Sequence, residues 1–232
     1  MTGVLEGTVG GRTLLVVAAA IEAAAVLRAL GGDPSLGERE WAPIAVCPRF
    51  DLVVSGVGKS AAAGATARFL DFERHDAVMS LGVAGALPGS GLGVGDVVIA
   101  TRAVFADEGF ETPDGFTDIA SAGFPPGPEG GMGVACDTGM AEAMRGLGAS
   151  GAVATVSTCS GTDRLALEVE RRTGAIAEAM EGGAVGVTAQ RVGGGARFSE
   201  LRVISNTTGD RGRQEWDLAG ALGRLGETAA RL

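Results

Sequence analysis

Five polar residues suited to acid–base or hydrogen-bond chemistry interrupt or end apolar segments of the sequence: Glu22, Glu178, Glu181, Arg202 and Asn206. Two carboxylates, an arginine and a carboxamide can together cleave a glycosidic C–N bond without a metal or a histidine. One carboxylate stabilises the oxocarbenium-like sugar, and a water is activated on the face opposite the leaving base. Taken singly, Glu22 is equally well explained as a first-turn helix carboxylate, and Asn206 as the start of a turn.

Histidine and cysteine offer no comparable arrangement. The only histidine, His75, lies in a polar run before an apolar segment, which is typical of a solvated residue at a helix end. The three cysteines are odd in number and widely spaced, so they predict neither disulfides nor a CxxC pair. We expect each to be a small buried residue; they are Cys47, Cys136 and Cys159. Without HExxH, EF-hand or Cys/His motifs, the sequence predicts neither a metal nor a cofactor.

Two glycine-rich stretches resemble phosphate-binding loops but lack a required glycine. Gly58, Lys59 and Ser60 match the end of a P-loop, yet Val53 occupies the earlier position where glycine lets the backbone wrap a phosphate. Residues 91–95 fail the dinucleotide fingerprint, because an aspartate stands where its last glycine belongs. This second stretch is therefore expected to form tight turns.

Length and charge restrict the class of protein. The chain has 232 residues, 46% of them hydrophobic, which suits one α/β domain with a single core. A net charge of −9 leaves no basic stripe for nucleic acid. The apolar run 14–20 is followed by Glu22 and by no cleavage site, so we expect neither a signal peptide nor a membrane span. We expect a cytoplasmic protein, with residues 1–12 as a flexible extension and residues 107–133 as an irregular loop.

Short apolar runs alternate with helical patterns along the chain. Near-continuous Val, Ile, Leu and Ala strands indicate burial on both faces, and this predicts a three-layer α/β/α sandwich. In such a fold the site lies at the carboxyl ends of the strands. Strands are predicted at 14–20, 51–55, 77–81, 96–105, 152–156, 175–180 and 201–205, and helices at 21–30, 60–72, 138–147, 162–173, 184–192 and from 214.

Four segments resemble, in the same order, motifs of the methylthioadenosine/S-adenosylhomocysteine nucleosidases. They are residues 51–70 (DLVVSGVGKSAAAGATARFL), 76–101 (DAVMSLGVAGALPGSGLGVGDVVIAT), 178–186 (EAMEGGAVG) and 202–206 (RVISN). The resemblance runs from about residue 14 to residue 222. It implies a nucleoside phosphorylase-like fold with a mixed central sheet.

Three features resemble the futalosine hydrolase branch of that superfamily more closely. They are residues 156–162, which begin VST, the EAMEG sequence at 178–182, and ISN at 204–206 followed by GDRGR at 209–213 and Trp216. The resemblance implies hydrolysis of the purine nucleoside futalosine to hypoxanthine and dehypoxanthine futalosine, in the futalosine route to menaquinone.

The resemblance also implies roles for individual residues. Met180 and Glu181 would hold the ribose, with Glu181 accepting hydrogen bonds from its hydroxyls. Glu22, aligned across a one-residue gap, would activate or orient the water, with Arg202 nearby. Asn206 replaces an aspartate that protonates adenine in the methylthioadenosine enzymes; an amide cannot donate that proton, but it can hydrogen-bond a purine edge.

Further substrate contacts are expected from Ala84, Gly85, Thr158, Gly161, Thr162 and Ala179. Futalosine carries a carboxylated aromatic ketone as its tail. Arg211 or Arg213 is expected to pair with that carboxylate, and Trp216 or a phenylalanine to line its path. A solvated run at a helix N-terminus explains the two arginines equally well.

Three other functions stay open. A purine nucleoside phosphorylase needs an arginine where this chain has Ser80, which favours water over phosphate as the nucleophile. A methylthioadenosine nucleosidase is disfavoured by Asn206. A nucleoside-binding module without catalysis is suggested by Val83, which replaces a water-binding serine of the family. The family commonly forms homodimers in which a partner's loop closes the site, and residues 105–116 are the candidate for that loop.

Overall fold

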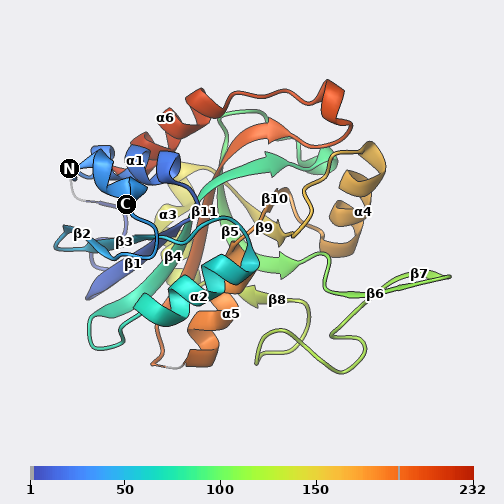
Figure 1. Ribbon diagram of the computed structural model, residues 1–232, viewed down its shortest axis with the longest axis horizontal. Coiled ribbons are helices and arrows are strands. Elements are labelled where there is room, and N and C mark those ends of the chain that lie inside the picture. The colour runs from blue at the N-terminus through green and yellow to red at the C-terminus, as the bar shows by residue number, and fades with distance from the viewer. Residues whose placement is uncertain (1–2, 193) are drawn as a thin grey trace.

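A mixed β-sheet with helices on both faces forms the frame of the protein (Figure 1). The computed structural model describes residues 3–192 and 194–232, and every element below lies in that part of the chain. The strands of the sheet are β1 (Arg12–Val17), β2 (Ile44–Cys47), β3 (Phe50–Val54), β4 (His75–Ala86), β5 (Val97–Phe105), β8 (Gly133–Ala135), β9 (Ala149–Thr155), β10 (Ala177–Ala179) and β11 (Arg197–Thr207). A separate hairpin pairs β6 (Gly109–Thr112) with β7 (Gly115–Asp118).

The helices are α1 (Ala20–Ala29), α2 (Lys59–Phe69), α3 (Thr138–Met144), α4 (Asp163–Thr173), α5 (Gly182–Val192) and α6 (Leu218–Ala229), with short 3₁₀ helices at Pro34–Glu38, Pro88–Ser90, Arg145–Leu147 and Arg211–Arg213. Along the sheet the order is β10-β9-β5-β11-β4-β1-β3-β2, with β8 paired to β5. Strand β4 runs parallel to β1 and β11, whereas β5 runs antiparallel to β11. The predicted mixed sheet is therefore confirmed. Among the described helices, none has the length and apolar character needed to cross a membrane.

Alternating side chains of the central strands supply two separate cores. In β1, Leu15 and Val17 point into the core that α1, α3 and α6 cover, whereas Leu14 and Val16 point into the core that α2 and α5 cover. Figure 1 shows α1 and α6 on the opposite side of the sheet from α2 and α5. Burial on both faces explains why the strands read as continuous apolar runs. The predicted three-layer α/β/α architecture is confirmed.

Strand β4 is longer than the sequence predicts. The sequence predicts a strand that ends at residue 81, but the strand continues to Ala86. Its last residues have ladder partners on both sides: Gly85 pairs with Glu178 of β10 and with Asn206 of β11. Glycine has a low intrinsic strand propensity, so these tertiary hydrogen bonds decide the conformation. The short β8 depends likewise on a distant partner, β5. The short β2 pairs with the adjoining β3 and was not predicted. Residues 107–133 were predicted to be irregular throughout, but they contain the β6–β7 hairpin.

The segment before β1 packs against the C-terminus. Leu5 is buried, the Val4 N–H donates to the carbonyl of Arg231 at 2.8 Å, and the Leu5 N–H donates to that of Leu232 at 3.0 Å. The prediction of a flexible extension is therefore wrong for residues 3–12, because Leu5 packs in the hydrophobic core. Residues 1 and 2 lie outside the described part of the chain.

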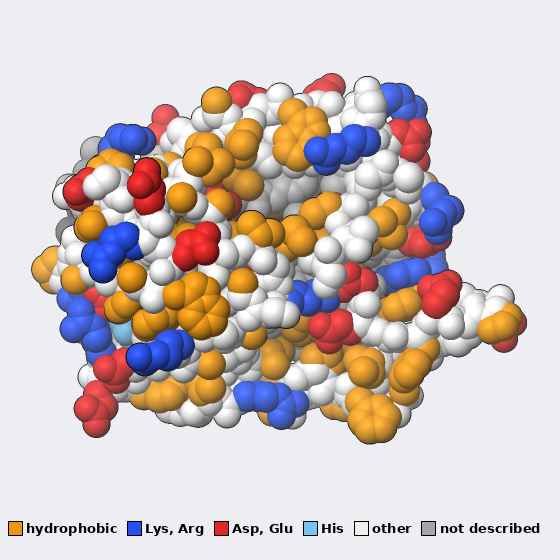
Figure 2. Space-filling view, viewed as in Figure 1, with side chains coloured by type: hydrophobic (Ala, Val, Ile, Leu, Met, Phe, Trp, Pro, Cys, Tyr) orange, Lys and Arg blue, Asp and Glu red, His pale blue; other side chains and the backbone are white. Residues whose placement is uncertain are grey.

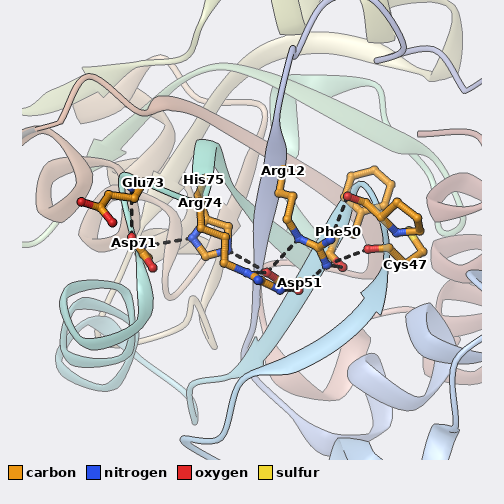
Figure 3. Close-up of polar contacts among 9 residues, drawn as sticks. Arg12, Cys47, Phe50, Asp51, Asp71, Glu73, Arg74 and His75 are labelled. Atoms are coloured by element: carbon orange, nitrogen blue, oxygen red, sulfur yellow. Dashed lines mark hydrogen bonds and ion pairs between the residues drawn. The ribbon is translucent and has the colours of Figure 1, made fainter.

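His75 is the first residue of β4 and is buried, so the prediction of a solvated helix end is wrong. Its Nε2 lies 3.0 Å from Oδ2 of Asp51, and its Nδ1 accepts a hydrogen bond from the Asp71 N–H at 3.1 Å. Arg12 and Arg74 donate to the same Asp51 carboxylate (Figure 3). Burial alone would raise the pKa of Asp51, but these donors hold it well below its usual range. The cluster ties the amino ends of three strands together.

Candidate active site

A cavity of about 310 Å³ opens at the carboxyl ends of β1, β4, β10 and β11. Figure 2 shows a hollow near the centre of this face, bordered largely by hydrophobic side chains. This is the edge of the sheet at which α/β folds place their sites. The predicted site residues that line the cavity are Glu22, Ala84, Gly85, Gly161, Ala179, Met180, Glu181, Asn206, Arg211 and Trp216.

Glu22 enters the cavity wall from the first turn of α1. Its Oε2 accepts a hydrogen bond from the Ala19 N–H at 3.0 Å, and its Oε1 accepts one from the Val83 N–H at 2.8 Å. The first contact satisfies an otherwise unpaired donor at the helix start, and the second ties the carboxylate to β4. Burial raises the pKa of Glu22, and the hydrogen bond from Val83 opposes that effect. Glu22 therefore serves as a helix-end carboxylate and as a group of the cavity at once.

Glu181 follows β10 and is held from two directions. Its Oε1 accepts a hydrogen bond from the Gly58 N–H at 3.0 Å, and its Oε2 lies 3.4 Å from Nη1 of Arg202. Gly58 has a φ of 96°, a conformation that favours glycine. Lys59 pairs with Asp107 beyond it. The glycine-lysine stretch that fails as a P-loop thus positions a carboxylate in the cavity.

Arg202 is not among the residues that line the cavity. It is fully buried on the face of β11 that α2 and α5 cover, where its Nε donates to Oε1 of Glu200 at 2.8 Å and its Nη2 donates to Oγ of Ser80 at 2.6 Å. Burial would lower the pKa of Arg202, but the charges of Glu200 and Glu181 raise it. Glu200 is not among the site residues predicted from the sequence. Burial raises the pKa of its carboxyl group. The guanidinium of Arg202 therefore contacts the Glu181 carboxylate from within the core and helps to fix its position.

Asn206 lies just after an irregularity in β11, where the pairing with β4 shifts register. Its Nδ2 donates to the carbonyl of Thr207 at 2.9 Å, and its Oδ1 accepts from Oγ of Ser205 at 3.0 Å. Glu178, one of the five polar residues singled out in the sequence, lines the same cavity, although the resemblance to nucleosidases implies no role for it. It places a charged residue in the middle of the apolar strand β10.

Thr158 and Thr162 do not line the cavity. Both are exposed, and Oγ1 of Thr162 accepts a hydrogen bond from the Leu165 N–H at 3.2 Å, which caps α4. Cys159 takes their place in the lining, so the prediction that it is buried is wrong. Partial burial raises the pKa of its thiol.

The mouth of the cavity is lined by apolar side chains and by the positively charged Arg211. Trp216, Ile21 and Val57 are each about half exposed there, and the Arg211 guanidinium carbon lies 5.0 Å from the centre of the Trp216 ring. Arg213 instead is not part of the cavity lining and pairs with Asp163 and Asp210. Across the described residues there is no group of three or more His, Cys, Asp or Glu side chains arranged to hold a metal ion.

Two solved structures of nucleosidases share the fold of this chain. The chain matches the futalosine hydrolase of Helicobacter pylori strain 26695 with a TM-score of 0.70 at 18% identity, over 95% of this chain and 94% of the other. It matches the methylthioadenosine/S-adenosylhomocysteine nucleosidase of Neisseria meningitidis, bound to methylthio-immucillin-A, with a TM-score of 0.70 at 23% identity, over 95% and 97%. At these identities the likeness establishes the fold.

Sequence comparison gives the family. A model of the Phosphorylase superfamily matches residues 51–232. The futalosine hydrolase of Acidothermus cellulolyticus is 38% identical over 95% of this chain and 90% of its own length, and that of Streptomyces coelicolor is 35% identical over 94% of each. The chain therefore belongs to the phosphorylase superfamily and, within it, to the futalosine hydrolase family.

Proposed function

We propose that this protein hydrolyses the N-glycosidic bond of futalosine and releases hypoxanthine and dehypoxanthine futalosine, a reaction of menaquinone biosynthesis. The observation that carries the proposal is that one cavity gathers Glu22, Glu181 and Asn206. These groups suit a water, a ribose and a purine respectively. The relatives from Acidothermus and Streptomyces that bear the name futalosine hydrolase support the choice of substrate.

The reaction needs a base for water and a stable environment for the sugar cation. Glu22 accepts a proton from the attacking water, for which a raised pKa is favourable. Glu181 accepts hydrogen bonds from the ribose hydroxyls and places negative charge near the oxocarbenium-like centre. The electron pair of the broken C–N bond leaves with the purine, and the water oxygen bonds to the sugar carbon. Asn206 hydrogen-bonds the departing base, which takes its proton from a second water, and Glu22 returns its own proton to the solvent to neutralise the hydroxide that this leaves.

Water is favoured over phosphate as the nucleophile. A phosphorylase needs cationic groups around its anion, and within the described residues Arg211 is the one Lys or Arg of the cavity lining. The guanidinium of Arg202 is already shared among Glu200, Glu181 and Ser80. Arg211 lies at the mouth, where it suits the carboxylate of the futalosine tail.

We also propose that the protein works in the cytoplasm as a homodimer. The β6–β7 hairpin extends away from the sheet (Figure 1), and Phe110 on it is about half exposed. An exposed apolar side chain on a projecting strand pair suits a contact with a second copy. Light scattering of the purified protein tests this: a dimer that Phe110→Asp converts to a monomer is the expected result, and a monomeric wild type contradicts it.

The substrate is tested by incubating purified protein with futalosine, inosine and methylthioadenosine, each with and without phosphate, and separating the products by HPLC. Hypoxanthine release from futalosine that does not depend on phosphate is expected. Efficient adenine release from methylthioadenosine, or a phosphorylated sugar product, would refute the proposal. Tight binding of a nucleoside without release of the base would identify a binding module instead.

A further inference from the structure

Glu178 is a buried carboxylate of the cavity wall that the proposed mechanism does not use. Its Oε1 accepts a hydrogen bond from the Ser160 N–H at 2.7 Å, and its Oε2 accepts one from the Ser160 hydroxyl at 2.6 Å. Unlike Glu181, it has no ion pair within the described chain. A buried carboxyl without a cationic partner is costly unless it has a ligand or a structural task, so its position in a substrate cavity is informative.

Glu178 and Asn206 lie on either side of Gly85. The two residues are the ladder partners of Gly85 on its opposite sides, in β10 and β11. A Cβ atom built on Gly85 would lie 3.1 Å from Nδ2 of Asn206 and 3.6 Å from Cγ of Glu178. Cγ2 of Thr208 would lie closer still, at 2.8 Å, so only a glycine lets these side chains approach β4 so closely. Glu178 and Asn206 therefore flank Gly85 on the same face, and all three residues line the cavity.

The hydrogen-bonding character of the two side chains is fixed by their other contacts. The Thr207 carbonyl can only accept, so the atom of Asn206 beside it is the amide nitrogen, which keeps a second N–H for another acceptor. The two donors from Ser160 favour the ionised form of Glu178, although burial raises its pKa. Each carboxylate oxygen keeps a lone pair. The cavity thus presents an acceptor beside a donor.

We propose that Glu178 determines the base specificity of the enzyme, by accepting a hydrogen bond from N1–H of a 6-oxopurine while Asn206 donates to O6. Hypoxanthine presents a donor at N1 beside an acceptor at O6, which complements this pair. Adenine presents an acceptor at N1 beside a donor at its 6-amino group, which opposes both members. The inference rests on the proposed function, because it requires a purine in this cavity.

Specificity for the base is measured as the ratio of kcat/KM for futalosine to kcat/KM for the analogue that carries adenine in place of hypoxanthine. A site built to hydrogen-bond a substrate group rejects a mismatched analogue strongly, so the wild-type ratio is expected to exceed about 100. Glu178→Gln keeps the shape but turns an N–H toward N1. We expect this variant to lower the ratio at least about 10-fold, by losing activity on futalosine and gaining it on the analogue.

Two further variants separate base recognition from a structural role. Ser160→Ala removes one donor to Glu178 but keeps the carboxylate, and it is expected to change both rates alike and leave the ratio near the wild-type value. Glu178→Asp keeps an acceptor and is expected to retain the preference. Equal losses for both substrates in Glu178→Gln would overturn the inference, since Glu178 would then only anchor the loop at Ser160.

Binding of the free bases distinguishes failure of the inference from failure of the proposed function. Calorimetry should give tighter binding of hypoxanthine than of adenine by the wild type, and a loss of that preference in Glu178→Gln. A wild type that is inert on futalosine but shows this pattern would refute the proposed substrate and uphold base reading by Glu178. Equal affinity of the wild type for both bases would overturn the inference even if futalosine is hydrolysed.

Discussion

Glu22 of α1 is tied to Val83 of β4 by a hydrogen bond of 2.8 Å between its Oε1 and the backbone N–H. Val83 stands where the resemblance to nucleosidases leads us to expect a serine that binds water. The main chain of β4 therefore contacts the carboxylate directly, whatever side chain position 83 carries. A second backbone donor, from Ala19, fixes the other oxygen. Glu22 is thus held in one orientation before any substrate binds.

The pH dependence of the reaction should report Glu22. Because burial raises its pKa above 4.5, the carboxyl stays protonated to higher pH than an exposed glutamate. It can accept a proton from water only when ionised, so kcat/KM should fall with decreasing pH through an apparent pKa above 4.5. Glu22→Gln should lower kcat/KM by about 10²–10⁴-fold and abolish this acidic limb. A limb at or below 4.5, or one that persists in the variant, contradicts the assignment.

Gly82 lies where Glu22 and Arg202 approach each other. A Cβ atom at this position would lie 2.5 Å from Oε1 of Glu22 and 2.8 Å from Nη1 of Arg202, so both side chains must move. We expect Gly82→Ala to lower kcat/KM at least about 10-fold and to cost about 1–3 kcal/mol of stability. Gly223→Ala is the control, because a Cβ there meets nothing within 4 Å in helix α6. It should stabilise the protein by about 0.5–1 kcal/mol without changing kcat.

Arg211 and Arg213 form a matched pair for testing recognition of the substrate tail. Arg211 lies in the cavity lining over Trp216, whereas Arg213 pairs with Asp163 and Asp210 outside it. A charge-assisted hydrogen bond contributes roughly 1.5–3 kcal/mol, so Arg211→Ala should raise KM for futalosine at least about 10-fold and leave KM for inosine unchanged. Arg213→Ala should change neither KM. An unchanged KM for futalosine in Arg211→Ala would exclude it as the partner of the carboxylate.

The sequence locates the site because polar residues directly follow two apolar strands. Glu181 and Asn206 lie near the ends of β10 and β11, and the carboxyl edge of the sheet brings them together. Arg202 is different. In a strand buried on both faces, the apolar pattern does not reveal which face a charged residue takes. Glu200, two residues earlier, shares its face and its ion pair, and that spacing is the signal that would have indicated a buried pair.

Features that depend on contacts distant in sequence could not be predicted. The extension of β4 relies on β10 and β11, and the buried His75 relies on Asp51 of β3, two strands away in the sheet. Both partners come from segments separated by at least one helix, so no local pattern contains the information. The position of Cys159 depends likewise on the path of the loop after β9. The order of strands and helices along the chain was predictable, because it follows from the alternation of apolar runs with helical patterns in the sequence.

Glu200 should act on the reaction only through Arg202. Its carboxylate fits against Gly182, where a Cβ atom would lie 2.1 Å from its Oε2, and it accepts a hydrogen bond from the guanidinium. Glu200→Ala should let Arg202 turn away from Glu181, and a drop in kcat of about 10-fold is expected for a group held less well. Glu200→Gln keeps the acceptor for Nε and should recover most of that loss. Equal defects in both variants would show that charge, and not orientation, is what Glu200 supplies.

Asp51 should determine stability and not turnover. Its pKa is lowered in the folded state, so the ionised carboxylate contributes stability at neutral pH that is lost as pH falls below its unfolded pKa of about 3.9. Asp51→Asn leaves His75, Arg12 and Arg74 without their shared anion. Breaking such a buried cluster costs about 3–5 kcal/mol of unfolding free energy at pH 7, and the difference from wild type should shrink in acid.

Measuring kcat on the folded fraction of Asp51→Asn tests whether the cluster at the amino ends of the strands affects the cavity at the opposite edge of the sheet. The cluster joins the amino ends of β1, β3 and β4, whereas the cavity lies at the carboxyl ends of β1 and β4, so kcat for futalosine should stay within about twofold of wild type. Asp114→Asn, in the exposed turn between β6 and β7, is the control for loss of an aspartate charge, and such a surface change costs about 0.5 kcal/mol or less. A large loss of kcat in Asp51→Asn would mean that disrupting the amino ends of the strands also disturbs the catalytic residues at the opposite edge of the sheet. Unchanged stability would mean instead that the two arginines and the histidine find other partners or water when the carboxylate is removed.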